Sequence, residues 1–368
     1  SSSTTTLKKP IALFLNCTRL DYDQKLNFDE LSNITDFRRN DVDVIPPRTV
    51  IPIPEEEEAA AASAAEDEIV RLVNEVHTGT EILILKEMQL PPSAVERFSD
   101  SVKLICEAGT GYNNIPIETC QKKDIAVCNI PTYSTDAVAQ TAITYIMNFA
   151  MNVFRQQDML RAGDRSNFTG PFALPLMELS GKTLGLVGGS GRIGTRVAEI
   201  ALVLGMRVVI SRRERGHENG GSHLSLPDDH ALANHPNVSV TADMGELLEC
   251  SDFVSIHTPL NAQTEGSFGR AQISQMKPTA YLINTSRGKV CNEDELIDCL
   301  REGLIAGAGL DVTASEPPVP DSGLWSLPNA WLSPHIGWRR LETRQRLVDM
   351  TRDNVAAYVR GAPINVVS

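Results

Sequence analysis

The sequence predicts an α/β protein with two domains, each a doubly wound parallel sheet covered by helices. The chain has 368 residues, which is too long for one ordinary core and suits two domains of about 150 to 200 residues each. Short β-rich runs alternate with helical patterns in the first third, and a second alternation starts at Thr183. Repeated alternation of this kind is typical of parallel sheets with helices on both faces.

In the first third, the strands are predicted from short apolar runs, as expected for strands buried on both faces. Helices are expected over Glu66–Val76, which has one apolar face, and over Ser93–Phe98. The acidic run Glu55–Glu58 is interpreted as a solvated helix start, where carboxylates interact favourably with the helix dipole. The expected strands are Ile11–Leu15, Val42–Ile45, Ile82–Leu85, Lys103–Cys106 and Ile125–Cys128.

The second alternation is long enough for a full doubly wound sheet. A long helix over Asp136–Gln156 precedes it and is apolar on several faces, so we expect it to bridge the domains or to lie in a subunit interface. Arg213–Pro236 contains four histidines but no apolar period, which indicates a surface insertion; without an i, i+4 pair or a nearby Cys, no metal site is expected. The expected strands are Thr183–Val187, Arg207–Ile210, Val238–Thr241, Phe253–Ile256, Ala280–Asn284 and Ile305–Asp311.

Composition excludes several classes of function. The formal net charge of −13 opposes binding to nucleic acid or to anionic lipid. The longest apolar stretch, Ile143–Phe154, is too short to span a membrane. Seven cysteines without a close pair favour a reducing compartment, cytoplasmic or organellar, over secretion. The initial Ser/Thr run is compatible with trimmed ends or with the remnant of a transit peptide.

The strongest chemical motif follows the strand at Thr183–Val187 and opens a helix over Arg192–Leu204. Glycines in such a turn let the backbone approach a pyrophosphate, whose charge the helix N-terminus stabilises. This context predicts a dinucleotide site. Its residues are Gly189, Ser190, Gly191, Arg192, Ile193 and Gly194.

The cofactor is predicted to be NADP(H), with NAD(H) possible. An acidic residue normally ends the second strand of such a unit and binds the ribose 2′-hydroxyl. Here the strand Arg207–Ile210 is followed by Ser211, Arg212 and Arg213. Guanidinium groups bind a 2′-phosphate by charge-assisted hydrogen bonds, whereas a carboxylate would repel it.

Three polar residues in the last third are the expected catalytic group: Arg287, Glu316 and His335. Each follows an apolar strand, and ligands of open α/β sheets bind outside the carboxyl ends of strands. Reduction of a 2-keto acid needs a cation for the substrate's oxygens, a proton donor for the developing alkoxide, and a carboxylate that orients that donor. Arg, His and Glu supply these three parts.

Over nearly its whole length the chain resembles the D-isomer-specific 2-hydroxyacid dehydrogenases. The resemblance is carried by Ala108–Ile115, Asn129–Ala139, His257–Leu260 and His335–Trp338. Within the family, four segments look closest to glycerate dehydrogenases, also called hydroxypyruvate reductases: Glu107–Asn114, His335–Trp338, Glu342–Arg346 and the terminal Pro363–Val367.

The resemblance implies a role for each site residue. Arg287 binds the substrate carboxyl and carbonyl, Glu316 pairs with His335, and His335 is the acid in reduction. Backbone amides near Gly109, Thr110 and Gly111 hold the carboxylate, and Asp311 lies near the nicotinamide. The further cofactor contacts are Thr258, Pro259, Thr264, Thr285, Ser286 and Gly337.

The resemblance also implies the domain organisation and the assembly. A discontinuous, flavodoxin-like substrate domain spans residues 1–140 and 340–368, and a Rossmann domain inserted between them spans 141–339. Closure of the domains would exclude water from the site. Two copies are expected to form a homodimer.

The substrate is expected to be a small 2-keto or 2-hydroxy acid, with hydroxypyruvate and glyoxylate first. Lys86 is a candidate for the substrate carboxylate, although an exposed Lys is the usual finding at such a position. Trp338 either restricts the pocket to short acids or is a core or interface residue. The alternatives are a bulkier 2-keto acid and a dinucleotide-sensing corepressor, whereas Glu316 argues against formate dehydrogenase, in which a Gln is expected.

Overall fold

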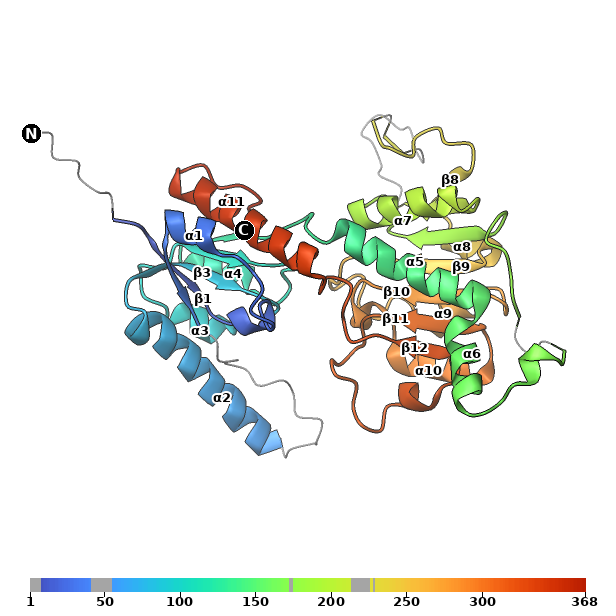
Figure 1. Ribbon diagram of the computed structural model, residues 1–368. Coiled ribbons are helices and arrows are strands. Elements are labelled where there is room, and N and C mark those ends of the chain that lie inside the picture. Colours follow the sequence, from blue (N-terminus) through green and yellow to red (C-terminus); the bar gives the residue numbers. More distant parts are fainter. Residues whose placement is uncertain (1–7, 41–54, 172–174, 213–225, 228) are drawn as a thin grey trace, which may run out of the picture. The chain divides into compact units, whose positions relative to one another are not determined.

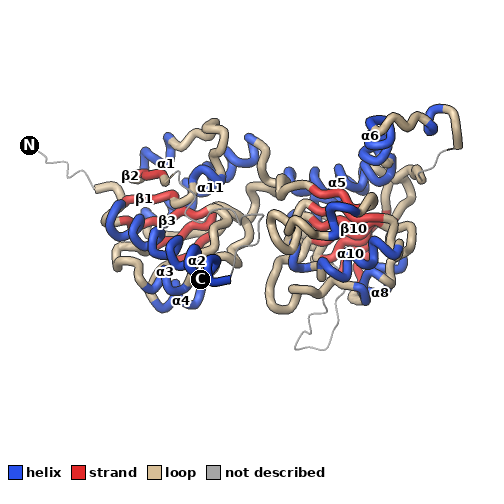
Figure 2. Tube along the Cα trace, turned by 90° about the horizontal axis from the view of Figure 1, so that it is seen from below, coloured by secondary structure: helices blue, strands red, loops and turns tan. Residues whose placement is uncertain are grey.

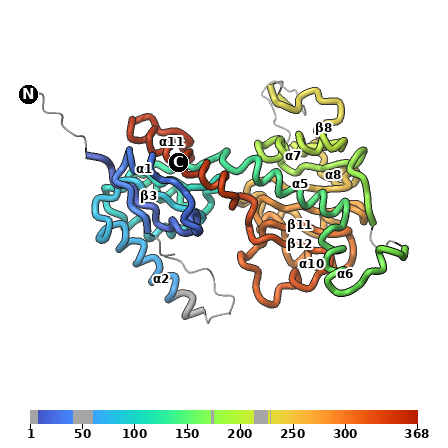
Figure 3. The backbone as a smooth tube through the Cα atoms, viewed as in Figure 1, coloured from blue at the N-terminus to red at the C-terminus, as the bar shows by residue number. Residues whose placement is uncertain are grey.

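The computed structural model describes residues 8–40, 55–171, 175–212, 226–227 and 229–368. The chain divides into two compact units, one made of Ser1–Ser134 and Arg339–Ser368 and the other of Thr135–Trp338 (Figure 1). The first unit is therefore discontinuous, with the blue and red ends of the chain in the same unit (Figure 3). The sequence places the boundaries after residues 140 and 339, whereas the structure places them after residues 134 and 338. The first boundary differs because all of helix α5 (Thr135–Met151) belongs to the second unit.

The first unit is built on a five-stranded parallel sheet with the strand order β2-β1-β3-β4-β5. This is a flavodoxin-like order. Helices cover both faces of the sheet (Figure 2). The strands are β1 (Ile11–Phe14), β2 (Asp36–Arg39), β3 (Thr80–Leu85), β4 (Leu104–Glu107) and β5 (Ala126–Cys128). The helices are α1 (Asp29–Ile34), α2 (Glu55–Arg71, continued as a π-helical turn over Leu72–Val76), α3 (Pro92–Glu96), α4 (Ile117–Lys122) and α11 (Leu341–Val359).

Sequence inspection missed strand β2. It lies at the sheet edge and carries polar side chains at three of its four positions, so it lacks the apolar run that marks the other strands. The strand expected at Val42–Ile45 lies outside the described residues. The helix expected from Glu66 starts earlier, at Glu55, with the acidic run in its first turn.

The second unit contains a seven-stranded parallel sheet with the order β12-β11-β10-β9-β6-β7-β8. The strand order reverses between β6 and β9, which is where ligands of doubly wound sheets bind. The strands are β6 (Thr183–Val187), β7 (Arg207–Ser211), β8 (Val238–Thr241), β9 (Phe253–Ile256), β10 (Tyr281–Asn284), β11 (Gly307–Leu310) and the short edge strand β12 (Ala330–Leu332), which was not foreseen. Besides α5, the helices are α6 (Val153–Arg161), α7 (Arg192–Val203), α8 (Met244–Cys250), α9 (Arg270–Ile273) and α10 (Glu293–Glu302).

The single helix expected over Asp136–Gln156 is wrong: it breaks at Asn152, and α6 follows it. Asn152 has a φ of 50°, the left-handed region that Asn tolerates better than most residues. The Asn148 side chain accepts a hydrogen bond from the amide of Phe154 (2.9 Å), which satisfies a donor at the start of α6. An apolar pattern alone does not reveal such a break.

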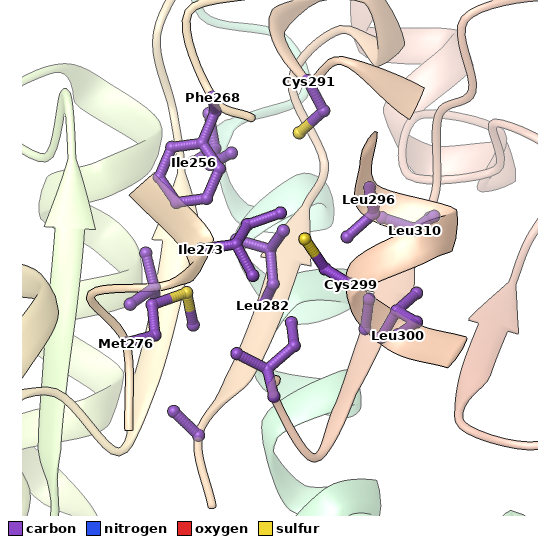
Figure 4. Close-up of a cluster of buried hydrophobic side chains, with 14 of the residues drawn as sticks. Ile256, Phe268, Ile273, Met276, Leu282, Cys291, Leu296, Cys299, Leu300 and Leu310 are labelled. Atoms are coloured by element: carbon purple, nitrogen blue, oxygen red, sulfur yellow. The ribbon is translucent and has the colours of Figure 1, made fainter. Parts of the chain in front are cut away.

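Buried apolar side chains fill both faces of the second sheet. One cluster joins β9, β10 and β11 to α8, α9 and α10; Figure 4 shows Ile273, Leu282 and Leu300 within it. The other joins the sheet to α5 and α7. Burial on both faces explains why these strands appear as continuous apolar runs. In the described ranges, no helix is long and apolar enough to cross a membrane.

Candidate functional site

The predicted site residues of the second unit lie at the carboxyl ends of its strands. The glycine loop follows β6, Ser211 ends β7, and Thr258 follows β9. Arg287 follows β10, while the segments carrying Glu316 and His335 follow β11 and β12. Because neighbouring parallel strands end at the same edge of a sheet, residues distant in sequence share this edge.

Close packing fixes the glycine loop. Gly188 has a φ of 78°, which only glycine adopts readily. A Cβ on Gly189 would lie 2.4 Å from the Cβ of Leu186, and one on Gly194 would lie 2.5 Å from the Cα of Gly189. These two glycines bring α7 directly against β6. Gly189, Gly191 and Gly194 thus have the G-x-G-x-x-G spacing of a dinucleotide-binding loop.

Gly191 differs from these glycines, because a Cβ there would meet only the carbonyl oxygen of Gly188, at 3.7 Å. The protein's own packing leaves room for a side chain at this N-cap of α7. The buried hydroxyl oxygens of Thr258 and Thr285, at the ends of β9 and β10, have no hydrogen-bond partner among the described residues. Open space at the helix N-terminus and two orphaned hydroxyls at strand ends fit a polar ligand such as a dinucleotide.

The segment that was expected to select the cofactor ends β7. The Ser211 hydroxyl accepts a hydrogen bond from the amide of Gly188 (3.2 Å), which ties it to the glycine loop. The Arg212 amide donates to the carbonyl of Thr241 (2.9 Å) and fixes the backbone there. Arg213 lies outside the described residues.

Other predicted cofactor residues are occupied within their own loops. The Thr264 hydroxyl donates to the carbonyl of Pro259 (2.6 Å) and accepts from the amide of Asn261 (2.9 Å). The Ser286 hydroxyl and amide both donate to the Asn284 side chain (2.8 and 3.0 Å). These contacts shape the loops after β9 and β10.

His335 and Glu316 are in direct contact, as predicted. Glu316 Oε2 lies 2.7 Å from His335 Nδ1. A carboxylate is an acceptor, so Nδ1 carries a hydrogen and Nε2 is the ring nitrogen that can exchange a proton with a ligand. The imidazole is 16% exposed and therefore accessible, while the carboxylate is 36% exposed.

Arg287 belongs to the same region through its loop. A Cβ on the neighbouring Gly288 would lie 2.0 Å from the carbonyl carbon of Thr313, so the loop after β10 packs against the one that leads to Glu316. The Arg287 guanidinium donates one hydrogen bond to the carbonyl of Ser286 (2.9 Å). Its remaining donors have no partner in the part of the chain that the structure describes, and a guanidinium has five.

Asp311 holds the turn that presents His335. Its buried carboxylate accepts hydrogen bonds from the amides of Ile336 and Gly337 (both 2.9 Å) and from the Ser333 hydroxyl (2.5 Å). His335 has a φ of 50°, a conformation that costs energy and persists only when its surroundings fix it. The structure therefore gives Asp311 and Gly337, expected near the nicotinamide, a clear role in shaping this turn.

Sequence inspection missed Tyr145 of α5. Its hydroxyl lies 2.7 Å from the Ser333 hydroxyl and donates toward it or toward the carbonyl of Leu310 (3.1 Å). Burial raises the pKa of Tyr145, which keeps the hydroxyl protonated. The only sign of this role in the sequence was that Tyr145 carries a hydroxyl within an otherwise apolar helix pattern.

In the first unit, the loop after β4 has the backbone expected of a carboxylate site. The carbonyls of Gly109 and Thr110 accept hydrogen bonds from Ile130 N (2.9 Å) and Asn129 Nδ2 (2.7 Å). The amides of Gly109, Thr110 and Gly111 have no acceptor among the described residues. Successive free amides are a common site for anions.

Lys86 is buried, although a lysine at such a position is usually exposed. It is 1% exposed, and its ammonium lies 2.9 Å from Glu87 Oε1 and 3.4 Å from the Tyr133 hydroxyl. Burial alone would lower the pKa of Lys86, but Glu87, Tyr133 and Glu107 outweigh it and raise that pKa. Lys86 therefore supports the loop from inside the unit.

Glu107, which sequence inspection also missed, lies under the same loop. Its carboxylate accepts from the Glu87 amide (3.0 Å) and from Asn114 Nδ2 (2.8 Å). Burial raises the pKa of Glu107 to about 7, although Lys86 opposes this shift. An acidic residue ending an apolar strand was the available signal.

Of the histidine-containing insertion, the structure describes His230 and His235, whereas His217 and His223 lie outside the described residues. Within the described ranges, no cluster of His, Cys, Asp or Glu is placed to hold a metal ion. Trp338 is buried, at 3% exposure.

Comparison with known proteins agrees with this geometry. Residues 143–337, more than half of the chain, match the model of the D-isomer specific 2-hydroxyacid dehydrogenase NAD binding domain. The chain is 34% identical over 290 residues to a hydroxypyruvate reductase of Blautia hydrogenotrophica, covering 78% of this chain and 85% of the relative. It is 30% identical over 318 residues to a glycerate dehydrogenase of Methylorubrum extorquens, covering 85% and 92%. A crystal structure from Polaromonas sp. JS6 66, described as an NAD-binding D-isomer specific 2-hydroxyacid dehydrogenase, superposes with a TM-score of 0.76 at 25% identity and covers 98% of this chain and 100% of its own.

Proposed function

Since the chain belongs to the D-isomer-specific 2-hydroxyacid dehydrogenases, oxidoreductases that act on CH–OH groups, we propose that it reduces a short 2-keto acid with NADPH. Hydroxypyruvate and glyoxylate are the proposed substrates. The observation that carries the proposal is the contact between Glu316 and His335 (2.7 Å) at the strand ends that also position Arg287. Two of the relatives, one named for hydroxypyruvate and one for glycerate, support the choice of substrate.

In the proposed mechanism, the bound dinucleotide supplies a hydride to the keto carbon. His335 gives the proton from Nε2 to the oxygen of the same carbonyl, which becomes the hydroxyl of the product. Glu316, on Nδ1, stabilises the imidazolium before that transfer and orients the ring after it. The Arg287 guanidinium neutralises the substrate carboxylate, and its remaining N–H donors polarise the carbonyl.

The proposed cofactor contacts follow from the orphaned groups of the second unit. The amides of Arg192 and Ile193 would hold the pyrophosphate, and the hydroxyls of Thr258 and Thr285 would satisfy their hydrogen bonds on the ligand. Ser211 and Arg212 are proposed to bind the 2′-phosphate and so to favour NADP(H) over NAD(H). The free amides of Gly109 to Gly111 are proposed to bind the substrate carboxylate.

The first experiment follows the loss of NADPH and NADH absorbance with hydroxypyruvate, glyoxylate, pyruvate, phenylpyruvate and a branched 2-keto acid. Turnover of a short acid with NADPH is the expected result. Turnover of only the bulky acids would identify a bulkier 2-keto acid, and not hydroxypyruvate or glyoxylate, as the substrate. Tight binding of the nucleotide without any turnover would favour a dinucleotide-sensing corepressor.

His335→Ala should lower turnover by about 100-fold or more while leaving NADPH affinity within a few-fold, because a general acid is lost and no cofactor contact is removed. Steady-state kinetics and a binding titration of the same preparation measure the two effects. Turnover that is unchanged in this variant would remove His335 from the mechanism.

Arg212→Asp should shift the preference toward NADH. A hydrogen bond to a charged group contributes about 1.5 to 3 kcal/mol, and the new carboxylate would also repel a 2′-phosphate. The ratio of kcat/KM for the two cofactors measures the shift. If that ratio stays the same, the phosphate binds elsewhere.

A homodimer is also proposed, joined through the second unit. Large apolar side chains are exposed along α5, α6 and the segment after them, as expected of a surface that another chain covers. They are Met147, Met151, Val153, Phe154, Phe168 and Leu176. Sedimentation equilibrium tests this assembly. None of the seven cysteines forms a disulfide bond, which favours a reducing compartment for the protein.

A further inference from the structure

The described part of the segment between β7 and β8 lines one side of a pocket beside the glycine loop. The pocket has a volume of about 630 Å³. Ser190, Arg192 and Thr195, from the glycine loop and the first turn of α7, line one side, and His230 from the insertion lines the other. All of these residues belong to the second unit.

The described part of the insertion is anchored to α7. Leu226 and Leu232, on either side of His230, are buried in the same apolar cluster as Val197 and Ala201 of that helix. Two backbone hydrogen bonds, from His230 N to the carbonyl of Pro227 and from Ala233 N to the carbonyl of His230 (both 2.9 Å), shape the turn. His230 is therefore held against α7.

A chain of hydrogen bonds gives His230 a defined tautomer. The amide of Leu232 donates to His230 Nδ1 (3.2 Å), so Nδ1 is an acceptor and carries no hydrogen. The ring hydrogen is then on Nε2, which lies 3.2 Å from Thr195 Oγ1 and donates to it. The Thr195 oxygen accepts this bond and, in the described residues, has no acceptor for its own hydrogen. This series of hydrogen bonds thus ends at the Thr195 hydroxyl, which presents an O–H donor to the pocket.

The pocket is lined by two arginines and two carboxylates, and the donors that can bind an anion lie on its helix side. Arg192 has no ion-pair partner in the described part of the chain, whereas Arg196 is bound by Asp136 and Glu199 (both 2.8 Å). Asp229 lies on the insertion side of the lining and has no ion-pair partner among the described residues. Hydroxyl and guanidinium donors on the helix side match the oxygens of a phosphate group.

We propose that Thr195 donates a hydrogen bond to a phosphate group of the bound dinucleotide, and that His230 is a positioning residue that aims the Thr195 hydroxyl. The inference deepens the proposed function and rests on its dinucleotide site. The phosphate is either the pyrophosphate, common to both cofactors, or the 2′-phosphate, present only in NADPH. The insertion then contributes to cofactor affinity through a residue that does not itself touch the cofactor.

The test measures the Kd of NADPH and of NADH by calorimetry, with the full chain and four variants. Thr195→Val keeps the side-chain shape and removes the hydroxyl, so affinity should fall about tenfold or more. His230→Ala should give a smaller loss, and His230→Gln, which keeps an N–H donor, should restore affinity to within about threefold of the unmodified chain. The double variant Thr195→Val with His230→Ala should lose no more than Thr195→Val alone, because one residue acts through the other.

His235→Ala is the matched control. His235 lies in the same insertion and its Nδ1 also accepts a backbone amide, from Asn237 (3.2 Å), but it is not part of the pocket lining. Its removal should leave both affinities unchanged. In Thr195→Val, a loss of affinity for both cofactors would identify the pyrophosphate as the ligand of Thr195. A loss of affinity for NADPH alone in that variant would identify the 2′-phosphate.

Two results would overturn the inference: unchanged affinities in Thr195→Val, or additive losses in the double variant. Failure of the proposed function has a different signature, in which the unmodified chain binds neither dinucleotide.

Discussion

Each unit has a glycine loop at the carboxyl end of a parallel strand, but the two loops are held by different forces. In the second unit, Gly189 and Gly194 leave no space for a methyl group, and van der Waals contact fixes the loop. In the first unit, buried charged groups support Gly109: a Cβ there would lie 2.9 Å from Glu107 Oε1 and 3.5 Å from Lys86 Nζ.

Because of this difference, we expect one loop to be sensitive to added side-chain volume and the other to pH. A loop fixed by close packing tolerates no added volume but does not respond to pH. A loop supported by buried charged groups responds to pH, because burial shifts the pKa of a carboxyl group and so couples its protonation to folding. Each of the following variants tests one side of this comparison.

The largest effect is expected for Gly194→Ala. The added Cβ would lie 2.5 Å from the Cα of Gly189, a contact between backbone atoms that no side-chain rotation relieves. We expect a loss of about 3 kcal/mol in stability of the second unit, together with loss of dinucleotide binding. Thermal unfolding and a cofactor titration measure the two effects.

Gly191→Ala is its matched control. The new Cβ would meet only the Gly188 carbonyl at 3.7 Å, so stability should change by less than about 0.5 kcal/mol. A drop in cofactor affinity in this variant alone would report on ligand contact. Equal destabilisation by the two substitutions would contradict the packing account.

Glu107→Gln should change how the stability of the first unit depends on pH. The pKa of Glu107 is raised by burial from its usual 4.5 to about 7. The folded state therefore binds the proton more tightly, and the stability from this group is complete below about pH 4.5 and is lost as pH rises through 7. The loss is about 3 kcal/mol, and the Gln variant, which does not titrate, should lack it.

Hydrogen exchange of β3 and β4 amides between pH 4.5 and 8 measures this slope, after correction for intrinsic exchange. Glu118→Gln makes the same chemical change at an exposed position of α4 and should keep the slope of the unmodified chain. A slope that survives in Glu107→Gln would assign the pH dependence to another group.

The smallest effect is expected for Thr110→Val. The Thr110 hydroxyl donates to the carbonyl of Ile130 (3.0 Å) at an exposed position, where one hydrogen bond is worth about 1 kcal/mol or less. The KM for the keto acid should rise a few-fold with little change in kcat, since only the loop is loosened. Thr110→Ser retains the hydroxyl and should behave as the unmodified chain; a rise in KM there would exclude this hydrogen bond as the cause.

By itself, the sequence determined the α/β class and the glycine motif, and it predicted Arg287, Glu316 and His335 as the catalytic group. These follow from local patterns: apolar runs record burial on both faces of a parallel sheet, and a polar residue just after such a run lies at the ligand-binding edge. The pairing of Glu316 with His335, which the family resemblance implied, is a direct contact although 19 positions separate the two residues.

Only the tertiary structure decided which groups hold those residues in place. Tyr145 supports Ser333 across 188 positions, and the contacts of Lys86 and Glu107 depend on how neighbouring strands are paired. The break at Asn152 and the edge strand β2 likewise arise from packing and hydrogen bonds that no local pattern records. Strand order brings together partners that are far apart in sequence, and burial and neighbouring charges then set their protonation. Neither can be obtained from one stretch of chain.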